Sequence, residues 1–286
     1  MSDVAAFEAQ RPRLKRLAYR MLGSVSEAED VVQDAWLRWD RAGEAAREPA
    51  AWLTQTTARL CLDRLKSARA RRETYVGPWL PEPLIEEEPA DPLERAEDVS
   101  VAFLLALERL SPLERAVFLL HDVFDQDYGQ VAMALGRDEA ACRQLASRAR
   151  GHLKEARPRY SVPQDQAMRL AAAFMSASAS QDFSALGALL AEDAVLISDG
   201  GGKRPAALRP MVGRADVLAL LKGLAWRGGL PGIEAMRPAR INGLPGVIMK
   251  NPDGLTTMAF ECNAQGLLAA IYIIRNPEKL AHLSAG

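Results

Sequence analysis

The stretch "EAACRQLASRARGHLKEAR" at 139–157 concentrates side chains that donate and accept hydrogen bonds on one predicted helix. Cys142 and Leu145 recur at the spacing of a buried helical stripe, which leaves a polar face turned outward. That face contains Arg143, Gln144, Ser147 and Arg148. Such side chains match the donors and acceptors that base edges present in the major groove of DNA, while Arg150 and Lys154 suit phosphate contacts. A lone basic helix is also typical of an ordinary solvated surface. The flanking sequence must therefore distinguish a DNA-recognition helix from a solvated one.

The residues before this helix predict a helix-turn-helix. "DYGQVAMAL" indicates a short first helix with Val131 and Leu135 on its inner side. Gly136 stands where that helix must end, since glycine accepts a positive φ without steric cost. Ala132 is small where the two helices would cross, and Cys142 is interpreted as a small buried apolar residue. The pattern favours DNA recognition over a solvated basic helix.

The charges are segregated along the 286-residue chain, although the net charge is only −1. One basic run comprises Arg59, Arg64, Lys66, Arg69, Arg71 and Arg72, and another comprises Arg137, Arg143, Arg148, Arg150, Lys154, Arg157 and Arg159. An acidic run lies between them: Glu82, Glu86, Glu87, Glu88, Asp91, Glu94, Glu97 and Asp98. Such segregation indicates a polyanionic partner, although each run alone is typical of a solvated face.

The cysteines Cys61, Cys142 and Cys262 are far apart and lack CxxC spacing. We therefore expect neither a disulfide framework nor a metal site. The N-terminus lacks the pattern of a signal peptide, and no apolar run is long enough to span a bilayer. These features predict a cytoplasmic protein that needs no metal, cofactor or membrane.

Residues 4–72 predict helices. In "SVSEAEDVVQDAWLRW", Ser26 and Glu29 have the spacing of a capping box, and Pro49 suits the first turn of the next helix. Residues 76–98 combine five prolines with the acidic run and predict an extended linker. The helical pattern returns over 99–156, with helix starts at "SPLERAV" and near Asp127.

From Gln164 the pattern changes to two amphipathic helices followed by short strands. The strand segments are "AVLIS", "GIEAMRPARI", "GVIM", "LTTMAFEC" and "LLAAIYII". Turn sequences such as Asn242-Gly243 separate the last four. The sequence predicts an antiparallel meander with helices on one face, which is an α+β unit.

The order of these segments resembles an extracytoplasmic-function sigma factor of bacterial RNA polymerase over residues 7–157. The resemblance rests on "EAEDVVQDAWLRW", the basic helix "AWLTQTTARLCLDRLKSARARR", the acidic linker and the helix-turn-helix. "YVGPWLPEPL" at 75–84 and "DGGGK" at 199–203 resemble motifs of the subgroup with a C-terminal SnoaL-like extension. That subgroup also has "NPDKL", which appears here as "NPEKL" at 276–280, with Glu278 keeping the charge.

This resemblance implies a multidomain fold and a role in transcription. The expected parts are an all-α sigma region 2 at 1–75, an acidic proline-rich linker at 76–98, an all-α sigma region 4 at 99–159, and an α+β SnoaL-like or ketosteroid-isomerase-like cone at 164–286. The chain is expected to bind core RNA polymerase and to direct initiation at particular promoters.

The resemblance also implies roles by position. The polymerase clamp helices would be bound by Asp30, Gln33, Asp34 and Trp36. The −10 promoter element would be contacted by Arg59, Arg64 and Lys66, whereas Trp52 could be only a core residue. The −35 element would be contacted by Arg143, Gln144, Ser147, Arg148, Arg150 and Lys154.

The role of the cone is the most open. SnoaL-like folds include enzymes that use a carboxylate base in an apolar pocket, and Asp199 and Tyr272 could imitate such an acid–base pair. Asp199 opens a glycine-rich loop, however, and a loop contact or a turn cap fits it better, so no catalytic residue is expected. The resemblance implies an attached regulatory domain whose ligand, if it has one, is unknown. Two alternatives stay open: a one-component DNA-binding regulator, and an isomerase or cyclase fused to a DNA-binding module.

The proline-stiffened linker carries apolar Trp79 and Leu80, which need a partner surface. We expect them to meet the "DGGGK" loop and the "NPEKL" tail. The residues expected to form these contacts are Asp199, Gly200, Gly201, Gly202, Lys203, Asn276, Pro277 and Lys279. The lysines could pair with the acidic linker. The cone is expected to dock on the linker and on the first sigma domain, and so to fix the distance between the two DNA-binding domains.

Overall fold

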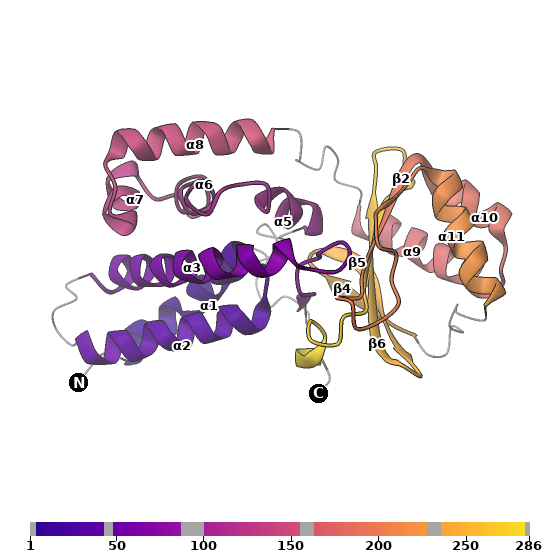
Figure 1. Cartoon of the computed structure of the whole chain (residues 1–286), viewed down its shortest axis with the longest axis horizontal. Helices are drawn as coiled ribbons and strands as arrows, with labels where there is room; N and C mark the ends of the chain where they lie inside the picture. Colours follow the sequence, from indigo (N-terminus) through magenta and orange to yellow (C-terminus); the bar gives the residue numbers. More distant parts are fainter. Residues whose placement is uncertain (1–3, 43–47, 87–99, 155–162, 228–235, 284–286) are drawn as a thin grey trace. The chain divides into compact units, whose positions relative to one another are not determined.

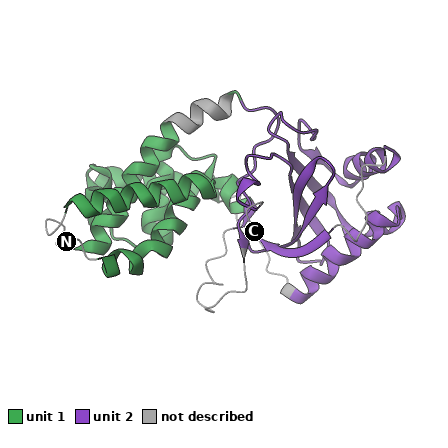
Figure 2. Cartoon of the chain, turned by 90° about the horizontal axis from the view of Figure 1, so that it is seen from below, with its two compact units in different colours: residues 1–74, 102–157 green, residues 75–101, 158–286 purple. Residues whose placement is uncertain are grey.

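The computed structural model describes residues 4–42, 48–86, 100–154, 163–227 and 236–283. The chain divides into two compact units (Figure 2). Unit 1 contains residues 1–74 and 102–157, and unit 2 contains residues 75–101 and 158–286. Each unit is therefore made of two stretches that are separated in sequence.

Three helices build the first part of unit 1 (Figure 1): α1 (Val4–Leu22), α2 (Val25–Ala42) and α3 (Pro49–Glu73). Pro49 is the first residue of α3, as the sequence predicts. Apolar side chains of the three helices, including Phe7, Trp39 and Leu53, pack into one core. Trp52 is partly buried against that core, with its ring centroid 5.6 Å from that of Trp39. Trp52 therefore has a packing role.

The start of α2 differs from the expected capping box. The helix begins at Val25, and the Ser24 hydroxyl accepts a hydrogen bond from the Glu27 backbone N–H at 3.1 Å. Ser26 lies within the first turn, and the Glu29 carboxylate is paired with Lys15 at 2.7 Å. The prediction of a cap at Ser26 is therefore wrong. Ser24 and Ser26 have the same capping chemistry, but a helix that is capped by Ser24 includes the buried Val25 in its first turn.

The second part of unit 1 follows the order α5 (Val101–Leu107), α6 (Pro112–Phe118), the π-helical turn η2 (Leu119–Val123), α7 (Tyr128–Leu135) and α8 (Glu139–Leu153). Ser111 and Glu114 form a reciprocal capping box at the start of α6. Asp127 caps α7 by accepting a hydrogen bond from the Gln130 backbone N–H at 2.8 Å. These helix starts confirm the positions expected at "SPLERAV" and near Asp127.

Helices α7 and α8 form the predicted helix-turn-helix. Gly136 ends α7 in the left-handed conformation, with φ of 62°. A Cβ atom at this glycine would meet nothing within 4 Å, so the position needs glycine for its backbone conformation and not for space. Ala132 and Cys142 are both buried where the two helices pack, and burial raises the pKa of the Cys142 thiol. The structure thus confirms the interpretation of Cys142 as a core residue.

Unit 2 is built on one mixed sheet with the strand order β1-β4-β5-β6-β7-β2-β3. The strands are β1 (Ile85–Glu86), β2 (Leu190–Asp199), β3 (Met211–Val212), β4 (Met236–Ile241), β5 (Leu244–Asn251), β6 (Gly254–Cys262) and β7 (Leu268–Ile274). Strands β4 to β7 form the expected antiparallel meander. Strand β2 joins it in parallel with β7, which the sequence did not predict. A parallel neighbour needs a long crossover connection, and α11 and the meander itself lie between these two strands.

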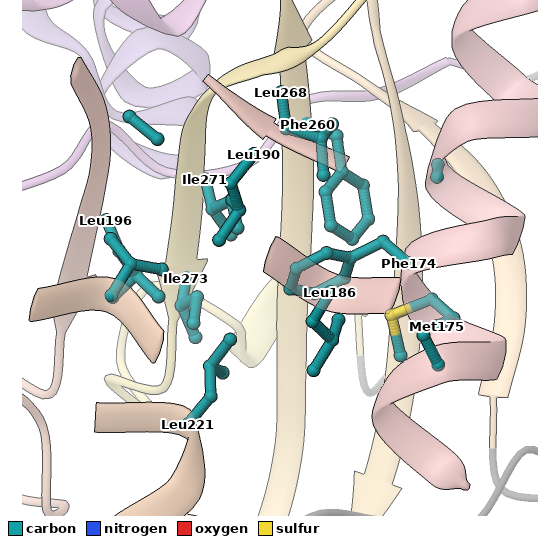
Figure 3. Packing of buried hydrophobic residues seen from close by; sticks show 14 of the residues in the cluster. Phe174, Met175, Leu186, Leu190, Leu196, Leu221, Phe260, Leu268, Ile271 and Ile273 are labelled. Atoms are coloured by element: carbon teal, nitrogen blue, oxygen red, sulfur yellow. The ribbon is translucent and has the colours of Figure 1, made fainter. Parts of the chain in front are cut away.

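Helices α9 (Gln164–Ala179), α10 (Phe183–Leu189) and α11 (Arg214–Trp226) pack against the sheet. Phe174, Leu186 and Leu221 from these helices belong to one core with Phe260 and Ile273 from the strands (Figure 3). The centroids of the Phe174 and Phe260 rings are 5.4 Å apart. The expected α+β unit is confirmed, with α11 as an additional helix.

The linker residues 75–86 belong to unit 2. Strand β1 pairs antiparallel with β4, with Ile85 opposite Ile241. Leu80 is fully buried, and Pro81 and Pro83 are buried as well. Side chains alternate between the two faces of the sheet along β2. The Leu196 side chain lies in the core between the sheet and the helices, so the Asp199 side chain lies on the other face of the sheet. Residues 76–86 of the predicted linker are therefore a folded part of the C-terminal unit, and residues 87–98 lie outside the described residues.

Within the described ranges, no helix has the length and apolar character needed to cross a membrane.

The helix crossing gives a first prediction. Replacing Ala132 by Leu should overpack the buried contact between α7 and α8 and lower the free energy of unfolding by about 1–3 kcal/mol. Cys142→Val should be tolerated, because valine is also a compact apolar side chain. Urea unfolding measures both effects, with the exposed Met133→Leu on the same helix as the matched control. Equal destabilisation by Ala132→Leu and Met133→Leu would contradict this account of the crossing.

Candidate nucleic-acid interface and linker anchor

The outer face of α8 carries the side chains that the sequence assigns to base recognition. Asp138 caps the helix by accepting a hydrogen bond from the Ala141 backbone N–H at 2.7 Å. Cys142, Leu145 and Ala149 are buried on its inner face. Arg143, Gln144, Ser147 and Arg148 are all exposed. The structure therefore brings the four predicted recognition residues together on one solvent-facing surface.

Two arginines of this face are oriented by acidic neighbours. Arg143 pairs with Glu139 at 3.0 Å, and its guanidinium lies 5.6 Å from the centre of the Tyr128 ring. The Nε of Arg148 lies 3.5 Å from a carboxylate oxygen of Glu114. Burial opposes ionisation of Glu114, but hydrogen bonds from Ser111 prevail and lower the pKa of the Glu114 carboxyl. Glu114 is thus a buried negative charge under the exposed Arg148.

Arg150 and Lys154 differ in their surroundings. Arg150 donates to Asp122 at 2.7 Å and to the Tyr128 hydroxyl at 3.4 Å, and the Asp122 hydrogen bond raises the pKa of Arg150. These contacts connect α8 to η2 and α7. Lys154 is exposed at the carboxyl end of α8. Arg150 therefore has a structural partner in addition to any DNA contact.

The three predicted −10 residues point to different partners. Arg59 donates to backbone carbonyls of α7, at 2.8 Å to Ala134 and 3.1 Å to Met133. Arg64 donates to Asp34 at 3.0 Å. Lys66 pairs with Asp63 one turn away on α3 at 3.0 Å. The structure therefore places them on one helix, each bound to a different partner.

The predicted polymerase-binding residues occupy the surface of α2. Asp30 and Asp34 both lie next to Arg64, at 3.4 and 3.0 Å. Gln33 and Trp36 line an open groove of about 780 Å³ between α1 and α2. The Trp36 ring is tilted against Phe7, with 4.8 Å between the centroids. The predicted residues are therefore divided between an ion-paired acidic surface and a groove with mixed apolar and charged lining.

Asp199 is the centre of a buried polar cluster in unit 2, which we call the linker anchor: Tyr75, Leu80, Asp199, Gly201, Asn276 and Lys279. One Asp199 carboxylate oxygen accepts hydrogen bonds from the Tyr75 hydroxyl at 2.6 Å and the Gly201 N–H at 3.0 Å. The other accepts from the Leu80 N–H at 2.8 Å and from Lys279 at 2.6 Å. The carboxylate is completely buried, so its charge depends on these donors.

Lys279 completes the linker anchor from the C-terminal tail. Its ammonium group also donates to the Leu80 carbonyl, so both backbone groups of Leu80 are bound. The ammonium lies 4.3 Å from the centre of the Trp79 ring and 4.9 Å from that of Tyr75, which are cation–π distances. Burial, followed by the hydrogen bond to Asp199, raises the pKa of Tyr75. The phenol therefore stays a donor to the carboxylate.

The glycines of "DGGGK" allow this close approach. Gly201 has φ of 59°, and a Cβ there would lie 2.3 Å from the Asn276 side-chain nitrogen. A Cβ at Gly200 would lie 2.1 Å from the Arg204 carbonyl oxygen. Gly202 also has a positive φ, of 70°, with Val76 of the linker next to it. A side chain at Gly201 would push the loop away from the tail, and one at Gly202 would push it away from the linker, whereas one at Gly200 would collide with the loop itself.

The linker has a second set of contacts near its end. Leu84 exchanges hydrogen bonds with Asn242, through its N–H at 3.2 Å and its carbonyl at 2.9 Å. His282 lies 2.9 Å from the Pro83 carbonyl oxygen. Three of the residues that contact or form the anchored linker were not predicted from the sequence: Tyr75, Asn242 and His282. Two of them had a signal in the sequence, because Tyr75 opens the "YVGPWLPEPL" motif and Asn242 lies in a predicted turn.

Lys203 pairs with Glu278, which joins the "DGGGK" loop to the tail, and Lys279 binds Asp199 and the Leu80 carbonyl of the linker. The expected pairing of these lysines with the acidic run stays a prediction, because residues 87–98 of that run lie outside the described residues. Asp199 and Tyr272 do not form an acid–base pair. The Tyr272 hydroxyl donates to Glu261 at 2.7 Å, and burial raises the pKa values of both groups. Asp199 is held by the linker anchor instead.

In the part of the chain that the structure describes, no group of three or more histidine, cysteine, aspartate or glutamate side chains could hold a metal ion.

Comparison with known proteins places these features in a family. Residues 6–71 match the Sigma-70 region 2 family, and residues 100–153 match the Sigma-70 region 4 family. The chain is 41% identical over 295 residues to the extracytoplasmic-function (ECF) RNA polymerase sigma factor SigJ of Mycobacterium tuberculosis, a match covering 97% of this chain and 93% of that one. It is also 40% identical over 188 residues to the probable ECF sigma factor SigI of M. tuberculosis, across 64% of each chain.

The fold agrees with these matches. The crystal structure of M. tuberculosis SigJ superposes with a TM-score of 0.80 at 36% identity, covering 98% of both chains. The similarity therefore extends through the two helical regions, the linker and the mixed-sheet unit. The chain belongs to the ECF sigma factors of RNA polymerase, which direct transcription initiation, and consists of sigma regions 2 and 4 followed by a SnoaL-like domain.

Proposed function

We propose that the C-terminal unit regulates this sigma factor by holding the linker between its two DNA-binding regions. The observation that supports the proposal is the linker anchor, in which one buried carboxylate, Asp199, binds the linker, the glycine loop and the tail together. Docking of this unit on the first helical region stays a prediction. The proposed domain limits are 1–75, 76–98, 99–159 and 164–286.

The anchored linker limits how far the two helical regions can separate. Residues 75–86, if free and fully extended, would span about 40 Å. In the structure they are bound at one end by the linker anchor and at the other by Asn242 and strand β4. Binding residues 75–86 at both ends removes most of the distance that they could span. Releasing or retaining the linker would therefore change the distance at which the two regions can contact a promoter.

The exposed face of α8 is the proposed −35 reader, through Arg143, Gln144, Ser147 and Arg148. Lys154 is the proposed phosphate contact, and Arg150 combines that role with its bond to Asp122. On α3, Arg59, Arg64 and Lys66 are the proposed −10 contacts. Asp30, Gln33, Asp34 and Trp36 are the proposed contacts to core RNA polymerase.

A catalytic role for Asp199 fits the contacts less well. A general base needs a carboxylate oxygen that can reach a substrate proton. Both oxygens of Asp199 are occupied by donors of the linker anchor, and the side chain is fully buried. We therefore assign Asp199 to binding the linker and propose no chemical reaction for this unit.

Base reading should be separable from phosphate binding. Arg143→Ala or Arg148→Ala should cost about 1–3 kcal/mol on −35 DNA and relax its base preference if the arginine is bidentate to a base. Lys154→Ala should weaken binding to all sequences and reduce the salt slope by about 1. Titrations on specific and random DNA measure these effects, with the exposed Arg169→Ala of α9 as control. Equal losses on both DNAs for all three variants would reject the assignment.

The linker anchor predicts a non-additive pair of substitutions. Lys279→Met leaves the buried Asp199 charge without its cation and should destabilise unit 2 by about 3–5 kcal/mol. Adding Asp199→Asn removes that charge and should recover part of the loss. Lys203→Met removes the exposed pair with Glu278 and should change the free energy of unfolding by less than about 1 kcal/mol. Denaturant unfolding and proteolysis of residues 75–84 are the measurements, and a similar effect of Lys203→Met and Lys279→Met would contradict the proposed dominance of the buried pair.

Two truncations test regulation. Ending the chain after Arg159 removes residues 160–286 and should change transcription strongly, with a reduction if the anchored linker holds the active geometry. Ending the chain just before Asn276 removes two members of the linker anchor, Asn276 and Lys279, and leaves the others in place. This truncation should raise transcription, because it releases the restraint on the linker. Run-off transcription with core polymerase on one promoter measures both. If both truncated proteins transcribe like the full chain, this unit does not regulate the sigma factor.

A further inference from the structure

A π-helical turn precedes the helix-turn-helix and places an aromatic pair beside it. The Phe124 N–H bonds the Leu119 carbonyl at 2.9 Å, so η2 contains one residue more than a turn of α-helix. The His121 ring of η2 stacks on the Tyr128 ring of α7, with 3.9 Å between the centroids and 27° between the planes. Single π-helical turns are frequent at functional sites, and this pair lies within reach of the recognition helix α8.

The two rings are held in place by their own elements. The His121 Nδ1–H donates to the Gln126 carbonyl at 2.7 Å, which sets the tautomer and the direction of the imidazole. Tyr128 is the first residue of α7, and the capping box of Asp127 and Gln130 fixes the start of that helix. The Tyr128 ring is half-buried and stacked, so a group that lies over it is held in a defined position.

Two arginines of α8 contact the Tyr128 side chain in different ways. The Arg143 guanidinium lies over the ring, 5.6 Å from its centre, which is within cation–π range. Arg150 donates to the hydroxyl at 3.4 Å and, more closely, to Asp122 of η2 at 2.7 Å. The ring is therefore a partner of Arg143, whereas the hydroxyl is a minor partner of Arg150.

Arg143 has a second partner, and the two partners use different parts of its guanidinium. The Glu139 carboxylate accepts a hydrogen bond from it at 3.0 Å, and both side chains are exposed, so water screens this ion pair. A carboxylate occupies N–H donors, which a bidentate contact to a base also needs. An aromatic ring attracts the charge through the flat face and leaves every donor free. The ring contact is therefore fully compatible with base reading.

We propose that Tyr128 is a specificity-determining positioning residue, which holds the Arg143 guanidinium by its face so that the N–H donors meet a base of the −35 element. The proposal rests on the proposed role of Arg143 in reading that element. Holding the guanidinium in the free protein reduces the side-chain entropy that is lost on binding. Only a base that accepts both donors gains from this order, so the effect appears as base preference.

The test measures the base preference of the complete holoenzyme. Core RNA polymerase with each full-length variant is bound to a promoter library whose −35 element is randomised, and the bound DNA is sequenced. The position at which Arg143→Ala loses preference identifies the base that Arg143 reads. At that position Tyr128→Leu should reduce the preference about two- to fivefold, the worth of an exposed cation–π contact. Tyr128→Phe keeps the ring and should retain the preference.

Two further variants separate positioning from a merely structural role. Tyr128→Leu in an Arg143→Ala background should cause no further loss at that position, because the guanidinium that the ring holds is absent. Glu139→Gln is the matched control, since it removes the charge of the other Arg143 partner and should leave the preference unchanged. Circular dichroism melting sets a temperature at which every variant is folded.

The outcomes distinguish this proposal from the −35 assignment. If Arg143→Ala loses base preference and Tyr128→Leu does not, the positioning role is rejected and Arg143 stays a base reader. Equal losses at every −35 position in Tyr128→Leu, or a further loss in the double variant, reject it as well. A loss in Glu139→Gln as large as that in Tyr128→Leu assigns the positioning to the carboxylate instead. If Arg143→Ala keeps every preference, the −35 assignment fails and the positioning role fails with it.

Discussion

The buried charge of Asp199 is the constraint on which the C-terminal unit depends. A carboxylate removed from water costs several kcal/mol unless donors surround it, and here the donors come from the linker, the glycine loop and the tail. Movement of any one of the three segments would remove part of that compensation. The same demand explains the glycine at 201, because a side chain there would displace Asn276 from the Tyr75 hydroxyl.

Cations bound to backbone carbonyls recur in both units, and burial distinguishes their roles. Lys279 at Leu80 and Arg115 at Met21 are nearly inaccessible to solvent, so their contacts are part of the fold. Arg59 makes the same type of contact at the surface of α3. An exposed hydrogen bond that breaks is replaced by one to water, whereas a buried one leaves its partner unsatisfied. The same chemistry is therefore worth more to the fold in the two buried contacts.

Local patterns were predictable from the sequence, and long-range partners were not. The helix-turn-helix follows from a helix stop at Gly136 and a stripe through Cys142 and Leu145, all within a few turns. The motifs around Asp199 and Lys279 marked the correct residues, but spacing could not say which side chain meets which. Spacing also missed the parallel β2–β7 pairing and gave no sign that Tyr272 binds Glu261.

The linker contacts also set an order of events during synthesis. Leu80 and Lys279 are 199 residues apart in sequence, which corresponds to on the order of 10–40 s of translation. The helices of residues 4–73 contain mostly local contacts and can fold in that interval, because short-range contacts form fastest. Leu80 leaves the ribosome long before its ammonium partner exists. A nascent chain therefore passes through a stage in which the first DNA-binding region is formed and the linker is still unbound.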